Sequence, residues 1–130
     1  MTEPIWVKLD ETLVVHDLQL SEHGGASGIR DAGLLESALA RPRNLFAYSV
    51  DSATLPRLAA AYAVGIIKNR PFVDGNKRTA LVVALGFLEL NGIEITAAQE
   101  EKFLTFLAVA QGEMTEEELA KWLDENSAQL

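Results

Sequence analysis

Cysteine is absent from this chain, and its absence excludes disulfide bonds, thiolate zinc sites and cysteine nucleophiles at once. No apolar run approaches the roughly 20 residues that a transmembrane helix needs, and the N-terminal residues lack the basic and apolar regions of an export signal. With only four prolines among 130 residues, the composition is that of an ordinary folded protein. We therefore expect one folded domain over residues 1–130, located in the cytoplasm and not in a membrane.

Positive charge is also scarce, because 11 lysines and arginines face 19 aspartates and glutamates and leave a formal net charge of −8. Such a charge repels nucleic acid at long range and argues against direct DNA or RNA binding. Four of the basic residues nevertheless fall within residues 68–78, which carry +3 while the other 119 residues carry −11. Any phosphate-binding site should therefore be local to this segment.

Apolar spacing predicts a compact all-α fold of six helices with almost no strand. After an extended segment at residues 5–9, the expected helices span residues 10–22, 32–40, 54–69, 77–90, 96–110 and 115–123. The third and fourth are apolar nearly all round, which is typical of central, buried helices.

Capping residues and helix breakers set the expected helix boundaries. N-caps or capping boxes are assigned to Asp10, Asp31, Thr54, Thr96 and Thr115. Pro42 is expected to end the second helix, because proline lacks the N–H that a helix interior requires. Residues 43–53 should then form a loop. Its aromatic residues, Phe46 and Tyr48, are either buried, which is the more common case, or exposed and available to a target protein.

The turn between the two central helices, residues 70–79, has the composition of a phosphate site. Gly75 allows close backbone approach, and the first N–H groups of the following helix are free to bind an anion. Lys77 and Arg78 are cations near the positive end of the helix dipole, which destabilises the helix slightly unless an anion is bound there. Asp74 is the one carboxylate in the turn and the candidate Mg²⁺ ligand, whereas Asn76 can cap the helix or bind a phosphate oxygen.

An alternative interpretation of the same residues is structural. Asp-Gly-Asn is a common turn signal between helices, and a Lys-Arg pair after it is often only a solvated surface. Phe72 and Pro71 are interpreted as structural in either case, because they can hold the loop against the core. Spacing alone leaves the two interpretations about equally favoured, since short glycine-containing motifs match many unrelated proteins.

The segment RPFVDGNKR at residues 70–78 resembles the active-site motif of the Fic superfamily, His-x-Phe-x-Asp/Glu-Gly/Ala-Asn-Gly/Lys-Arg. Lys77, followed by RTAL, is more similar to the Doc (death on curing) branch than to the adenylylating branch, which has glycine there. The stretches EHGG at residues 22–25, GIRD at 28–31 and GLLESALARP at 33–42 also resemble Doc-like proteins. The resemblance covers about the first ninety residues.

Membership of the Doc branch implies an all-α Fic fold and a toxin of a bacterial toxin–antitoxin system. The implied reaction transfers the γ-phosphate of ATP to a hydroxyl of elongation factor Tu, which stops translation, and the implied partner is an antitoxin peptide. Carried over by motif position, Asp74 binds Mg²⁺, Gly75, Asn76 and Lys77 form the anion site, and Arg78 holds a further phosphate. Phe72 anchors the loop.

One position departs from the motif, because Arg70 stands where the family has its catalytic histidine. A guanidinium with a pKa above about 12 cannot accept a proton near neutrality, whereas an imidazole can. This arginine is either natural or an inactivating replacement, and both predict a toxin with little activity. His16 and His23 are not expected to substitute as the base, since one lies in mid-helix and the other at a helix end.

Three functions remain open from the sequence. The first is a Doc-like kinase toxin inactivated at Arg70, and the second is a Fic-type nucleotidyl transferase that moves AMP. The third is a pseudoenzyme that only binds its antitoxin or a nucleotide. Lys77 favours the first over the second because its side chain would occupy space that glycine leaves open, and Arg70 favours the third.

Overall fold

Six helices and two short strands make up the computed structural model, which describes residues 2–130. The elements in chain order are α1 (Leu9–His23), α2 (Ala32–Tyr48), α3 (Leu55–Asn69), α4 (Asn76–Leu90), β1 (Ile93–Ile95), α5 (Gln99–Ala110), α6 (Glu116–Glu125) and β2 (Ser127–Gln129). The two strands pair antiparallel, with Ile93 opposite Gln129. The predicted six-helix, all-α fold is confirmed.

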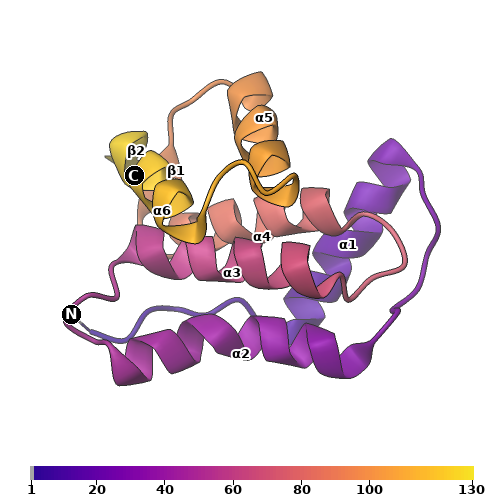
Figure 1. Cartoon of the computed structure of the whole chain (residues 1–130), viewed down its shortest axis with the longest axis horizontal. Helices are drawn as coiled ribbons and strands as arrows, with labels where there is room; N and C mark the ends of the chain where they lie inside the picture. Colours follow the sequence, from indigo (N-terminus) through magenta and orange to yellow (C-terminus); the bar gives the residue numbers. More distant parts are fainter. Residues whose placement is uncertain (1) are drawn as a thin grey trace.

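Helix α3 forms the centre of the molecule and lies between α2 and α6, with α4 behind it (Figure 1). Every residue from position 58 to position 67 is buried, as the apolar pattern predicted. Small side chains let the neighbouring helix approach, because a Cβ on Gly65 would lie 3.3 Å from the Cα of Ala38 in α2. Larger side chains such as Leu58 and Phe87 fill the remaining core, each contributing about 1.5–3 kcal/mol by burial.

The ends of α3 and α4 frame the turn at residues 70–75. The hydroxyl of Thr54 accepts a hydrogen bond from the N–H of Arg57 (3.3 Å), so Thr54 caps α3 as predicted. Helix α4 begins at Asn76, one residue earlier than expected, and ends at Leu90. The site is thus positioned by the ends of two rigid, buried helices.

Helix α2 does not end at Pro42 but continues to Tyr48, so the expected helix boundary and loop were wrong. The predicted cap is present, since Asp31 accepts from the N–H of Leu34 (3.0 Å). The missing N–H of Pro42 costs about 3 kcal/mol in a helix interior. Burial of the proline ring, together with core contacts of the following turn, offsets that cost.

The aromatic residues of this last turn differ in exposure. Phe46 is half-buried and packs edge-on against Trp6, with 5.8 Å between ring centroids. Tyr48 is 89% exposed at the helix end. Only one of the two aromatics is therefore available on the surface.

Two other helix starts differ from expectation. Helix α1 begins after Lys8, not Asp10, and the carboxylate of Glu11 accepts from the Lys8 N–H (2.9 Å). Thr96 does not cap α5, which begins at Gln99 without a side-chain cap. The Thr96 N–H and hydroxyl both donate to the carbonyl of Asn126 (2.8 and 3.1 Å), extending the β1–β2 pair.

The capping box of α6 is present as predicted. The Thr115 hydroxyl accepts from the N–H of Glu118 (3.1 Å), and the Glu118 carboxylate accepts from the N–H of Thr115 (2.9 Å). The hydrogen bond from the Thr115 backbone, followed by the one involving its side chain, lowers the pKa of Glu118. Within residues 2–130, no helix combines the length and the apolar character that crossing a membrane requires.

Candidate functional site

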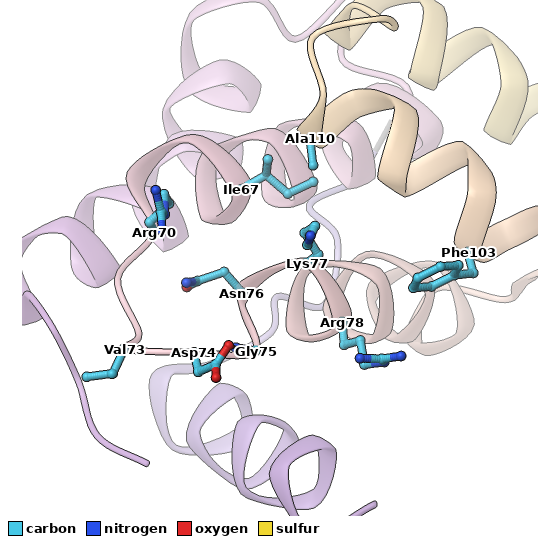
Figure 2. A pocket seen from close by; sticks show the side chains of 10 residues that line it. All are labelled: Ile67, Arg70, Val73, Asp74, Gly75, Asn76, Lys77, Arg78, Phe103 and Ala110. Atoms are coloured by element: carbon cyan, nitrogen blue, oxygen red, sulfur yellow. Dashed lines mark hydrogen bonds between the residues drawn. The ribbon is translucent and has the colours of Figure 1, made fainter. Parts of the chain in front are cut away.

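A cavity of about 530 Å³ opens where the end of α3, the start of α4 and one side of α5 meet (Figure 2). It brings together most of the residues singled out from the sequence. Its lining is Ile67, Arg70, Val73, Asp74, Gly75, Asn76, Lys77, Arg78, Phe103 and Ala110. The predicted segment thus forms one wall of a real cavity, and α5 contributes an apolar wall.

The first turn of α4 presents unpaired donors to this cavity. Gly75 precedes the helix with φ 79°, a left-handed conformation that glycine adopts without strain. The first helical hydrogen bond runs from the Thr79 N–H to the Gly75 carbonyl (3.0 Å). Within residues 2–130 the N–H groups of Asn76, Lys77 and Arg78 have no acceptor, and α4 has no side-chain cap. These three residues therefore lie in the first turn, as predicted, and their donors are free.

The Asn76 side chain is engaged within the loop. Its amide oxygen accepts from the Phe72 N–H, and its amide nitrogen donates to the Phe72 carbonyl, both at 3.0 Å. The side chain therefore neither caps α4 nor is available to a phosphate oxygen, contrary to the two roles considered from the sequence. It fixes the turn, and its backbone N–H supplies the free donor.

The Asp74 carboxylate is exposed at the edge of the cavity. One oxygen accepts from the Gly75 N–H (3.0 Å) and the other from the Ala26 N–H (3.3 Å). Within residues 2–130, no group of three or more acidic, histidine or cysteine side chains is arranged so that it could hold a metal ion by itself. An exposed carboxylate beside free N–H donors fits Mg²⁺, which takes one or two carboxylates and completes its shell with water and phosphate oxygens.

Lys77 and Arg78 leave α4 in different directions. Figure 2 shows Lys77 extending toward Ile67 and Ala110, whereas Arg78 lies on the side of Phe103. The Arg78 guanidinium carbon is 5.3 Å from the centroid of the Phe103 ring, within cation–π range. Phe103 lies within the helix expected over residues 96–110, and nothing in the sequence predicted its contact with Arg78.

Arg70 caps the end of α3 in the left-handed conformation (φ 48°), and its N–H donates to the Ile66 carbonyl (3.0 Å). Its side chain is exposed and lines the cavity. Arg30 binds the carbonyls at this helix end, donating from Nη2 to Asn69 (2.6 Å) and from Nε to Arg70 (2.7 Å). Arg70, at the motif position of the histidine, therefore lines the same cavity as the three residues with free N–H groups.

His16 holds the loop from behind. Its ring stacks on Phe72 with 3.8 Å between centroids and 9° between planes, and both side chains are buried. Nε2 lies 2.8 Å from the Asp74 carbonyl, which can only accept, so this nitrogen carries the hydrogen. His16 does not line the cavity, and neither does His23, which lies 3.7 Å from Glu22.

Besides the contact of Phe103, the contacts of Arg30 and His16 with the turn are features of the site that the sequence did not predict. Arg30 lies in the GIRD stretch that contributed to the resemblance, but nothing in its spacing indicates a contact with residues 69 and 70. His16 contacts a residue 58 positions away in the sequence. Neither contact has a local sequence signal.

Comparison with known proteins gives consistent matches. Residues 6–88 match the sequence family described as Fic/DOC family. Over 114 residues the chain is 34% identical to "Protein kinase doc" of Escherichia phage P1, covering 88% of this chain and 89% of that protein. Over 77 residues it is 46% identical to "Toxin Doc" of Mycolicibacterium smegmatis, covering 57% of each chain.

Proposed function

The chain belongs to the Fic/DOC family, and from that premise we propose that it is a Doc-type toxin whose site binds ATP and serves transfer of the γ-phosphate to a protein hydroxyl. Elongation factor Tu is the proposed target, and a cognate antitoxin peptide is the proposed partner. The two relatives are described as a protein kinase and a toxin, which agrees with this proposal. The proposed place of action is the cytoplasm, where ATP and the target are present.

The observation that carries the proposal is the set of three unpaired N–H groups at Asn76, Lys77 and Arg78. They belong to residues that line the cavity, at the positive end of a helix dipole, where a phosphate group is favoured. Two cationic side chains in the same turn raise the energy of the empty site and favour an anion. The proposed ligand at this turn is the polyphosphate of a nucleotide.

We propose that the side chains around the free N–H groups have separate roles in binding ATP. Arg78 presents a planar fork that can hold two oxygens of one phosphate, and its contact with Phe103 limits its rotamers. Asp74 is the proposed ligand of Mg²⁺, which would neutralise phosphate charge when bound. Asn76 keeps the loop in shape through Phe72, so that the N–H groups converge.

The proposed reaction needs a base at position 70. A target hydroxyl forms a bond to the γ-phosphorus, the bond from that phosphorus to the β,γ-bridging oxygen breaks, ADP leaves, and the hydroxyl proton goes to a base. The Arg70 guanidinium cannot accept that proton, and loss of a general base typically costs about 10²- to 10⁴-fold in rate. We therefore infer that this chain binds ATP but transfers phosphate slowly or not at all.

A non-catalytic nucleotide- or antitoxin-binding module is the second candidate, and Arg70 is the observation that favours it. Its guanidinium adds positive charge to a cavity that already has two cations. AMP transfer is disfavoured by Lys77, whose side chain extends into the space between α4 and the residues Ile67 and Ala110 (Figure 2).

Position-labelled ATP distinguishes these functions in the Arg70→His variant. We expect γ-labelled ATP to label elongation factor Tu and α-labelled ATP to leave it unlabelled. Expressed without an antitoxin, the same variant should arrest bacterial growth at a level at which the parent chain is tolerated. Label from the α position would indicate AMP transfer, whereas a folded variant that binds ATP but transfers no label and arrests nothing would support the binding module.

A further inference from the structure

Three successive carbonyl groups at the end of α3 accept hydrogen bonds from one residue, Arg30. Its Nη2 donates to Asn69 (2.6 Å), its Nε to Arg70 (2.7 Å), and its backbone N–H to Pro71 (2.7 Å). The N–H of Asp31 also donates to the Pro71 carbonyl (3.0 Å). The loop between α1 and α2 therefore holds the turn that carries position 70.

A helix cap alone does not account for this arrangement. Helix α3 already ends with a standard bond from the Arg70 N–H to the Ile66 carbonyl. The additional bonds fall on a turn whose conformation is uncommon, because Arg70 is the one non-glycine residue with positive φ among residues 2–130. Such a conformation persists when the surrounding structure holds it, and the side chain of that residue lines the cavity.

We propose that Arg30 is a positioning residue: it fixes the backbone at position 70 and thereby keeps the side chain of residue 70 in the cavity that holds the anion site. This inference rests on the proposed function, because that function is what makes position 70 important. A planar guanidinium can donate in parallel to two adjacent carbonyls, whereas the lysine ammonium is a point charge on a flexible stem. Charge alone is therefore insufficient, and Arg30→Lys is the informative change.

The first test measures the backbone directly and does not depend on activity. In the parent chain, NMR order parameters at residues 69–73 should be near the rigid value of about 0.85. In Arg30→Lys they should fall toward about 0.6, while those of α4 and α6 stay unchanged. Arg43→Lys is the matched control, since Arg43 is also exposed but stacks over Trp6, 5.6 Å from its ring centroid, and does not line the cavity.

The second test uses the Arg70→His background and separates kcat from KM. Arg30→Lys should lower kcat for γ-phosphate transfer by about tenfold to a hundredfold, the scale of a misplaced catalytic group. The KM and Kd for ATP should change less than about twofold, because the three N–H donors belong to α4. If the Arg70→His variant is itself inactive, the proposed function fails, and the order parameters still decide the role of Arg30.

Unchanged order parameters at residues 69–73 in Arg30→Lys would overturn the inference, and Arg30 would then be a replaceable helix cap. Equal loss of kcat and ATP affinity would also contradict it. Arg30→Gln provides a second variant that keeps a donor without the charge. If both variants lose the fold as a whole, Arg30 serves the entire domain and the proposal is wrong.

Discussion

Lys77 and Lys68 provide a matched pair of exposed cations at opposite helix ends. Lys77 lies in the first turn of α4, where the helix dipole is unfavourable for a cation, and Lys68 lies in the last turn of α3, where it is favourable. Each interaction is worth about 0.3–1 kcal/mol at low ionic strength. Lys77→Gln should therefore stabilise the free protein by that amount, and Lys68→Gln should destabilise it similarly.

Both substitutions change the net charge by the same amount, so general repulsion within the acidic chain cancels in the comparison. For a domain of this size, about 0.3–1 kcal/mol corresponds to a shift in Tm of roughly 1–4 °C. Thermal unfolding at low salt should show shifts of opposite sign for the two variants. Both shifts should shrink as salt screens the charges.

Without a ligand, Lys77→Gln should have a higher Tm than the parent, and addition of ATP and Mg²⁺ should reverse this order. A ligand that binds only the folded state stabilises it by RT ln(1 + [L]/Kd), so a weaker Kd gives a smaller rise in Tm. Lys77→Gln should gain less from ATP than the parent, whereas Lys68→Gln should gain the same amount. If Lys77→Gln destabilises the free protein, or if its response to ATP equals that of the parent, the anion-site argument is refuted.

Three further predictions address individual residues. Asp74→Ala should weaken ATP binding, measured by calorimetry, by about tenfold or more with Mg²⁺ present but only little in EDTA. An equal loss of affinity in EDTA would mean that Asp74 maintains the shape of the loop and does not bind Mg²⁺. His16→Ala should cost about 2–4 kcal/mol in urea unfolding, against under about 0.5 for exposed His23→Ala. Burial raises the pKa of Tyr62 to about 12, so the free energy of unfolding should fall by about 2 kcal/mol between pH 10 and 12, and this loss should be absent in Tyr62→Phe.

The sign of the Tyr62 prediction follows from proton linkage. The folded pKa lies above the ordinary value of 10, so the unfolded chain loses its proton first as the pH rises. The stabilisation is complete below pH 10 and is lost as the pH rises through 12. The hydroxyl accepts from the N–H of Val7 (3.0 Å) and lies 3.4 Å from its carbonyl, so Tyr62→Phe should cost about 1–3 kcal/mol at neutral pH.

The fold was predictable where local signals and tertiary packing agree. Thr54 and the apolar periodicity placed α3 correctly, and the Thr115 box placed α6, because both caps act within one turn of their helices. The local signal of Pro42 predicts a helix end, but its unfavourable effect is offset by burial of the ring and by the core contacts of Leu45 and Phe46, and neither is a local property of the sequence. Thr96 has the sequence pattern of a cap, but its N–H and hydroxyl donate to the Asn126 carbonyl beside the β1–β2 pair, and α5 begins only at Gln99.

The site was predictable to the extent that its residues are contiguous. Residues 70–78 form one turn and the start of one helix, so their placement around a common cavity follows from a local motif. The residues that hold this turn are not local. Arg30 reaches it from 39 and 40 positions away and His16 from 58, and such contacts depend on how α1 and α2 pack.

The most direct test of the missing base at position 70 compares Arg70→His with Arg70→Gln. The glutamine side chain is uncharged and, like arginine, cannot act as a base near neutral pH. Single-turnover transfer from γ-labelled ATP to elongation factor Tu should be about 10²- to 10⁴-fold faster in Arg70→His than in Arg70→Gln or the parent. Calorimetry should give ATP Kd values for the two variants within about threefold of each other, because the N–H donors of α4 are unchanged. Equal transfer rates in two folded, ATP-binding variants would contradict the assignment of position 70 as the site of the missing base.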